Sequence, residues 1–141
     1  MRKLFTLGFA ALILAAMTMA VAVSAQTNKV SITVSSSWDK VYAWMWKCPK
    51  QYSERFMSLT QVDDSTWTMT LDMDETAYKK AGILFVDTDS WNGDLQKTSD
   101  FRLSSGCYTI PKTQKQGQLV KRPNGLVCRE LIFDCNKVDC K

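Results

Sequence analysis

The sequence contains no histidine, and this absence excludes several reaction chemistries. Without an imidazole there is no Ser-His-Asp or Cys-His nucleophile pair and no histidine-based zinc site. A large excess of one charge is also lacking, since 18 Lys and Arg oppose 14 Asp and Glu for a formal net charge of +4. What remains is a one-domain chain with modest charge.

The one long hydrophobic run lies at the N-terminus. Two basic residues precede an apolar run from Leu4 to Val23, and Val23-Ser24-Ala25 places small side chains where a signal peptidase cleaves. We therefore predict a signal peptide over residues 1–25 and a mature chain that begins at Gln26. The alternative interpretation of this run is a retained membrane anchor.

Removal of a signal peptide and export of the chain would limit the classes of partner and the compartments that suit it. Residues 1–25 carry two basic and no acidic side chains, so the net charge falls from +4 to +2 when they are removed. Such a small charge favours neither nucleic acid nor an anionic membrane as a partner. We expect a single exported domain, monomeric, in a periplasm, at a cell surface or in the medium.

All five cysteines follow the predicted cleavage site, and an exported chain favours disulfides. The odd number leaves one thiol free, buried or paired between chains, and the spacing does not choose the pairing. Because three of the cysteines lie close together near the C-terminus, we predict that disulfide bridges hold the C-terminal segment onto the rest of the domain. The irregular spacing does not suit a thiolate metal site, so no metal is predicted. The disulfide candidates are Cys48, Cys107, Cys128, Cys135 and Cys140.

Short alternating or continuous apolar stretches predict strands, and no amphipathic helix of normal length is visible. A segment over 74–81 is long enough for one or two helical turns only. The pattern predicts an all-β fold, a small antiparallel β-sandwich of the immunoglobulin-like kind, over residues 26–111. A cysteine-rich hairpin over 112–141 packs on it. The predicted strands are 30–35, 41–46, 67–71, 83–86, 101–103 and 107–110, followed by a hairpin over 119–133 around Asn124-Gly125.

The most informative feature is the alternation of Tyr42, Trp44 and Trp46. In a strand these rings project from one face, and the smaller residues between them project from the other. If the smaller residues face the core, the rings form an exposed patch, which is typical of a binding surface. The alternative is that the aromatic face is the core. We favour the binding surface because indole and phenol groups need polar partners.

A row of aromatic rings suits sugars, which have an apolar face and a polar rim. Each stacked hexose would remove roughly 40–60 Å² of apolar surface from water, worth about 1–1.5 kcal/mol. The loop over 91–100 adds Trp91 for stacking and Gln96 for hydrogen bonds to hydroxyls. The alternative for this loop is a hairpin turn with Trp91 folded over it.

These pieces together resemble the family 26 carbohydrate-binding modules, which are starch-binding β-sandwiches often appended to α-amylases. The resemblance covers about residues 29–110. It implies binding of an α-glucan polysaccharide or maltooligosaccharide between Tyr42, Trp44 and a third aromatic residue. The matching pieces are Trp38, 41–44, 59–62, Trp67, 83–85, 91–93 and 98–101.

The family's third aromatic position has no clean match, because its Trp-Pro-Gly is absent before Leu59. Tyr52 and Phe56 are the candidates to replace it. The family also places a Gln beside the final Thr, where this chain has Lys97, with Gln96 one residue upstream.

Two other chemistries fit less well. The carboxylates of 87–94 suggest structural calcium, but the frame lacks the ligands of an EF-hand loop. A glycoside hydrolase needs two carboxylates across a cleft, and the acidic residues of 63–75 fall in turn-like segments. We predict a secreted, non-catalytic carbohydrate-binding protein without a cofactor. The alternative is a disulfide-stapled exported protein-interaction module with no sugar ligand.

Overall fold

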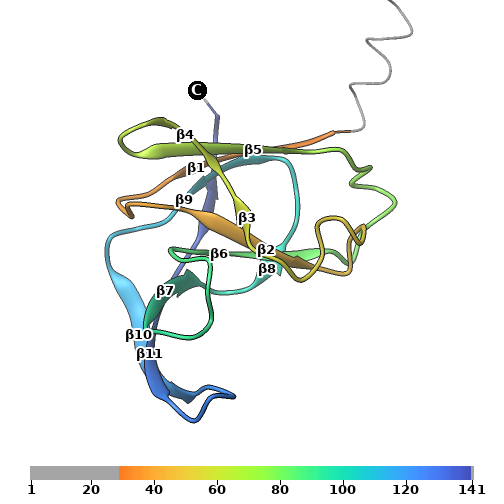
Figure 1. The fold of residues 1–141 in the computed structure, drawn as a ribbon. Coiled ribbons are helices and arrows are strands. Elements are labelled where there is room, and N and C mark those ends of the chain that lie inside the picture. The colour runs from red at the N-terminus through yellow and green to blue at the C-terminus, as the bar shows by residue number, and fades with distance from the viewer. Residues whose placement is uncertain (1–28, 141) are drawn as a thin grey trace, which may run out of the picture.

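The computed structural model describes residues 29–140, and this part of the chain forms twelve strands and no helix (Figure 1). The predicted signal peptide lies outside the described residues. The strands are β1 (Val30–Ser35), β2 (Tyr42–Trp46), β3 (Met57–Ser58), β4 (Thr60–Asp63), β5 (Thr66–Leu71), β6 (Gly82–Val86), β7 (Leu95–Thr98), β8 (Phe101–Arg102), β9 (Gly106–Thr109), β10 (Gln114–Lys121), β11 (Val127–Phe133) and β12 (Asn136–Val138).

Two sheets pack face to face. The first has the strand order β12-β9-β1-β5-β4, and the second has β10-β11-β7-β6-β2-β3 with β8 beside β6. The predicted all-β sandwich is confirmed. Most neighbours are antiparallel, as the sequence predicts, but β1 with β9 and β7 with β11 run parallel. Each parallel pair joins strands that are distant in the sequence, so local patterns carry no signal for it.

The main core lies between the sheets and is built by the predicted alternation. On β1 the side chains of Val30, Ile32 and Val34 are buried, and Val34 pairs with the buried Trp67 of β5. Each such side chain contributes on the order of 1.5–3 kcal/mol by leaving water. The alternation therefore fixes which face of each outer strand supports the fold.

Strand β6 is different because both of its faces are buried. Ile83 and Phe85 join the main core, whereas Leu84 and Val86 belong to a second, smaller apolar cluster on the other side of the sheet. A continuous apolar run is typical of a strand that is covered on both faces. The outer face of the second sheet thus carries an apolar layer of its own.

Two local expectations need correction. Residues 95–98, which we expected inside a loop, form β7, whose mixed Leu-Gln-Lys-Thr sequence lacks a strand signature. Residues 74–81 form consecutive turns instead of a helix. The Asp74 carboxylate accepts a 2.9 Å hydrogen bond from the Thr76 amide. The Ala77 amide donates to the Asp74 carbonyl, and the Ala81 amide donates to the Tyr78 carbonyl, which closes the turns. A side chain that caps a local turn competes with helix propagation.

The C-terminal segment enters both sheets. Strands β10 and β11 form the predicted hairpin around Asn124-Gly125, where Gly125 adopts a left-handed φ of 87° that favours glycine. Strand β11 then pairs with β7, while β12 crosses to pair with β9 in the first sheet. The end of the hairpin projects beyond the sandwich (Figure 1).

One disulfide is formed, between Cys107 of β9 and Cys140. It holds the C-terminal segment onto the first sheet, as the clustering of cysteines predicts. Cys48, Cys128 and Cys135 are free thiols, so the expectation of a single unpaired cysteine is wrong. The Cys128 thiol donates a hydrogen bond to the Asn92 carbonyl at 3.5 Å, and burial raises the pKa of the Cys135 thiol to about 12.

Candidate functional site

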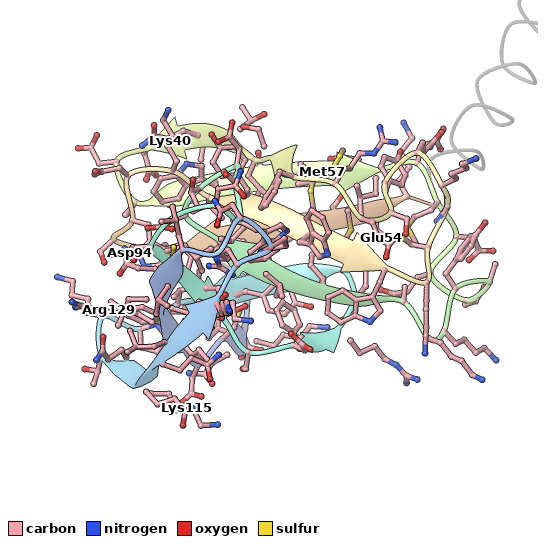
Figure 2. The ribbon with its side chains drawn as sticks, turned by 60° about the horizontal axis from the view of Figure 1, so that its bottom comes forward. Lys40, Glu54, Met57, Asp94, Lys115 and Arg129 are labelled. Carbon is pink, nitrogen blue, oxygen red and sulfur yellow. A yellow bond between two sulfur atoms is a disulfide. The ribbon has the colours of Figure 1, made fainter. Side chains whose placement is uncertain are left out.

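The aromatic strand β2 presents its rings on the outward face of the second sheet. Ala43 and Met45 are fully buried at 0% exposure, while Tyr42, Trp44 and Trp46 are half-buried on the opposite side. Figure 2 turns this outer face toward the reader. The structure therefore gives the strand the two faces that its alternation predicts.

The rings form a cluster and not a flat row. Trp44 lies 4.8 Å from Phe56 and 5.2 Å from Trp91 between ring centroids, and Phe56 lies 5.0 Å from Trp91. The planes of Trp44 and Trp91 are nearly perpendicular, at 77°. Phe56 comes from the segment that follows β2, and Trp91 comes from the connection between β6 and β7. We call these three residues the aromatic cluster.

A buried apolar layer supports the rings from below. Tyr42 pairs with Val86 across the sheet, and Trp44 pairs with Leu84. Leu84, Val86 and Leu95 are the buried members of the outer apolar layer, against which the rings pack. Paired side chains in a sheet lie on the same face, so the layer holds the aromatic rings in fixed positions.

The geometry separates the two candidates for the third aromatic residue. Phe56 is in the cluster, whereas Tyr52 packs against the main core. The Tyr52 hydroxyl accepts a 2.8 Å hydrogen bond from the Asp72 amide. Tyr52 is thereby occupied in joining two segments of the fold, and Phe56 is the residue that the structure brings to Trp44.

Gln96 does not join the aromatic residues. Side chains alternate along β7, so Gln96 shares a face with the fully buried Thr98, while Leu95 and Lys97 share the aromatic face. The Gln96 side chain donates a 3.0 Å hydrogen bond to Asp87. The position that matches the family's Gln therefore faces the rings, but it holds Lys97.

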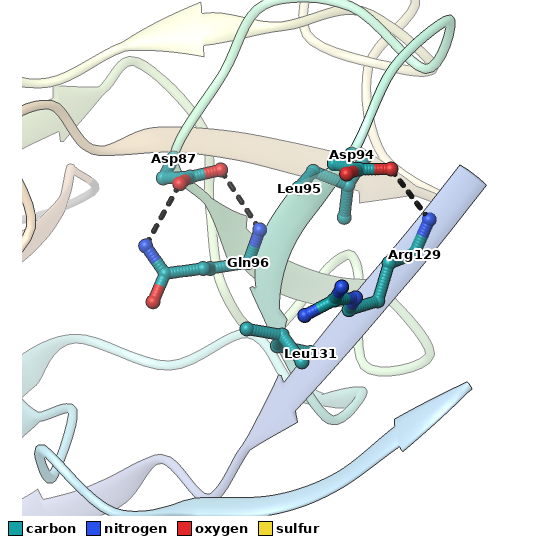
Figure 3. Close-up of a pocket in the computed structure, with 6 residues that line it drawn as sticks. All are labelled: Asp87, Asp94, Leu95, Gln96, Arg129 and Leu131. Atoms are coloured by element: carbon teal, nitrogen blue, oxygen red, sulfur yellow. Dashed lines mark hydrogen bonds between the residues drawn. The ribbon is translucent and has the colours of Figure 1, made fainter. Parts of the chain in front are cut away.

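Gln96 instead lines a separate hollow of about 300 Å³, drawn in Figure 3. Most of the hydrogen bonds of the polar groups that line this hollow are made to one another. Asp87 accepts hydrogen bonds from the backbone and the side chain of Gln96, and Asp94 accepts a 2.7 Å bond from the Arg129 amide. These bonds fasten the loop between β6 and β7 at both of its ends.

A buried ion pair on the hairpin holds the same loop. Arg122 donates a 2.7 Å hydrogen bond to Glu130 and a 3.2 Å bond to the Gly93 carbonyl, two residues from Trp91. Arg122 and Glu130 are only 7% and 5% exposed. Burial raises the pKa of Glu130, but hydrogen bonds from Arg122 and Gln118 and the charge of Lys97 outweigh it and leave the pKa lowered. The hairpin thus positions Trp91 over Trp44, a role that the sequence patterns did not reveal.

Neither a metal cluster nor a membrane-spanning helix is found within residues 29–140. No group of three or more Cys, Asp or Glu side chains there is placed to hold a metal ion. No helix in this part of the chain is long and apolar enough to cross a membrane. What distinguishes the described surface is the aromatic face.

In comparisons with known proteins, no protein-family model matches the chain, and no curated protein matches it. The likeness to the family 26 modules therefore rests on the residues quoted from the sequence and remains a prediction.

Proposed function

We propose that this protein is an exported, non-catalytic carbohydrate-binding protein that recognises starch-like α-glucan on the outer face of its second sheet. The observation that carries the proposal is the aromatic cluster of Trp44, Phe56 and Trp91, with Tyr42 two residues away on the same strand face. The rings remain partly exposed although a buried apolar layer is present beneath them. Rigid, partly exposed rings are typical of surfaces that bind ligands by stacking.

The arrangement of the rings favours a curved glycan. The planes of Trp44 and Trp91 differ by 77°, so the two cannot stack on a flat ribbon of sugars at once. An α-1,4-linked chain curves, and its successive rings present differently tilted apolar faces. Together with the Tyr42-x-Trp44 pattern and its family resemblance, this geometry supports α-glucan over a flat β-linked polymer.

The expected affinity is low for a single site. Two or three stacking contacts of about 1–1.5 kcal/mol each, after the cost of association, give dissociation constants from about millimolar to tens of micromolar. A polymer offers many equivalent sites, so repeated engagement raises its apparent affinity. Polymeric ligands are accordingly the most sensitive probes.

The test is native gel electrophoresis of the purified protein with and without amylopectin in the gel. We expect retardation of the wild type, and loss of it in Trp44→Ala. Val62→Ala is the control, because Val62 is exposed on β4 of the other sheet. Unchanged wild-type mobility in amylopectin, glycogen and other α-glucans would refute the proposal, and retardation that survives Trp44→Ala would refute the site.

A second candidate function is protein interaction, favoured by the hairpin. Leu119, Leu126 and Val127 are 74%, 59% and 63% exposed, and they lie on or beside the turn that projects from the sandwich. Leu119 and Val127 lie on the same face of the hairpin, because Leu119 pairs with Arg129 and Val127 pairs with Lys121, and exposed apolar side chains of this kind favour a protein partner. If no glycan retards the protein, this candidate takes precedence.

A further inference from the structure

The indole of Trp46 lies at a separate groove, which the aromatic cluster does not include. Trp46 pairs with Gly82 of β6, and a methyl group at Gly82 would overlap the Cε2 and Cζ2 atoms of the indole. The ring therefore lies directly across the backbone of β6. Glycine at this position is what permits the close approach.

Next to this ring lies a hollow of about 320 Å³ with charged walls. Strand β8 pairs with β6 so that Arg102 is opposite Gly82, which places Arg102 on the face that carries Trp46. Phe101 points the other way and packs on Phe85 of the main core at 5.5 Å. The hollow is lined by Trp46, Lys80, Gly82, Asp100 and Arg102 among others.

The charged groups of this groove are available to a ligand. Lys80, Asp100 and Arg102 are exposed, and none of them takes part in an ion pair within residues 29–140. Elsewhere on the second sheet, charged groups such as Arg122 and Glu130 are paired. The groove thus combines an apolar ring with one carboxylate acceptor and two cationic donors.

We propose that the Trp46 groove is a second sugar subsite, which binds a neutral hexose unit of the same glucan chain through two adjacent hydroxyl groups. The inference rests on the proposed function. A hydroxyl both donates and accepts, so a pair of them can donate to Asp100 and accept from Arg102 or Lys80. The apolar face of the sugar stacks on the indole. The unit is a neutral hexose because the proposed ligand is an uncharged glucan, whose hydroxyl groups can use both the carboxylate and the cationic groups.

Continuity with the aromatic cluster identifies the occupant. Trp44 and Trp46 are two residues apart on one strand face, roughly 7 Å along the chain direction. A glucan that stacks on Trp44 therefore reaches the Trp46 groove with a neighbouring unit, provided that it is long enough. The subsite consequently adds affinity for longer oligosaccharides and none for the shortest.

The experiment is titration of tryptophan fluorescence with maltooligosaccharides from two to seven units, using wild type, Arg102→Gln and Asp100→Asn. Loss of one charged hydrogen bond should weaken binding of the longest oligosaccharide about tenfold and leave the shortest that binds unchanged. Arg129→Gln is the matched control, since Arg129 is exposed and lines the hollow of Figure 3. Circular dichroism of each variant verifies folding.

The outcomes separate the two proposals. Equal affinity of wild type, Arg102→Gln and Asp100→Asn at every length, with binding still dependent on Trp44, overturns the subsite and leaves the proposed function standing. Absence of wild-type binding to any maltooligosaccharide or α-glucan overturns both. A uronic-acid oligosaccharide that binds more tightly than the neutral one, with an affinity that falls steeply with salt, overturns the assignment to a neutral sugar.

Discussion

At the residue scale, the position of Gly82 determines how the aromatic face is built. Trp46 can lie across β6 only because residue 82 has no side chain. Any larger residue there would push the indole away from the strand and change the shape of the groove beside it. The sequence contains this signal as a glycine at the start of a buried apolar run, but its meaning depends on Trp46 being its partner across the sheet.

We expect Gly82→Ala to destabilise the protein by about 1–3 kcal/mol, the usual cost of forcing extra volume into a packed position. Displacement of Trp46 toward water should also shift tryptophan emission to longer wavelength. Thermal unfolding followed by fluorescence measures both effects. Gly93→Ala is the control, because a methyl group at Gly93 would meet no atom within 4 Å. Equal melting temperatures of the two variants would contradict the packing argument.

Tyr52 and Phe56 should respond differently to substitution. Tyr52→Phe removes the hydroxyl that accepts from the Asp72 amide, so we expect a loss of at most about 1 kcal/mol in stability and unchanged glycan retardation. Phe56→Ala removes a ring of the aromatic cluster and should reduce retardation strongly. Denaturant unfolding and gel mobility, measured on both variants, test the assignment. Loss of retardation in Tyr52→Phe alone would reverse it.

At the scale of elements, the hairpin β10–β11 supports the loop that carries Trp91. Its ion pair between Arg122 and Glu130 is buried, and Arg122 also binds the Gly93 carbonyl. Removal of one partner leaves an uncompensated buried charge, which costs about 3–5 kcal/mol in other proteins. The cost in this protein should lie at the low end for Arg122→Met, because Lys97 remains 3.6 Å from Glu130.

The ion pair also gives stability a pH dependence with a defined sign. The pKa of Glu130 is lowered in the folded state, from an ordinary value of 4.5. Its contribution is therefore fully present above about pH 4.5 and is lost as the pH falls through the lowered folded-state pKa. We expect the melting temperature of wild type to exceed that of Glu130→Gln at pH 7, with the gap closing below pH 4.5. A gap that widens in acid would contradict the assignment.

The elements also show what sequence patterns can and cannot predict. Alternation found β1, β2 and β5 and the two faces of β2, because one buried face imposes a period of two. Strand β7 was missed, since Gln96 and Lys97 interrupt the apolar pattern and pairing with β6 and β11 stabilises it. The contact of Trp91 with Trp44 was also beyond prediction, because it depends on loops held by a distant hairpin.

At the scale of the whole molecule, the C-terminal segment ties the two sheets together. After β11 in the second sheet the chain crosses to β12 in the first, and the disulfide between Cys107 and Cys140 closes this connection. The bridge spans a sequence separation of 33 residues. A loop of that size corresponds to about 3–4 kcal/mol of stabilisation in the chain-entropy account.

We expect Cys140→Ser to lower the free energy of unfolding by about 2–4 kcal/mol, measured by guanidinium denaturation. The rate of amide hydrogen exchange should rise first in β12, which pairs with β9 next to the disulfide. Addition of a reductant should destabilise wild type by a similar amount and leave Cys140→Ser unchanged. A further loss in the variant on reduction would show that another disulfide exists.

Both ends of the described chain emerge from the first sheet, where β1 begins at Val30 and the bridge anchors Cys140 beside β9 (Figure 1). The aromatic face is the outer face of the second sheet, on the opposite side of the sandwich from both ends. A label, a surface linker or a fused reporter attached through either end would therefore leave the rings unobstructed. The same orientation would let the protein be immobilised on a sensor with its aromatic face directed into the solution.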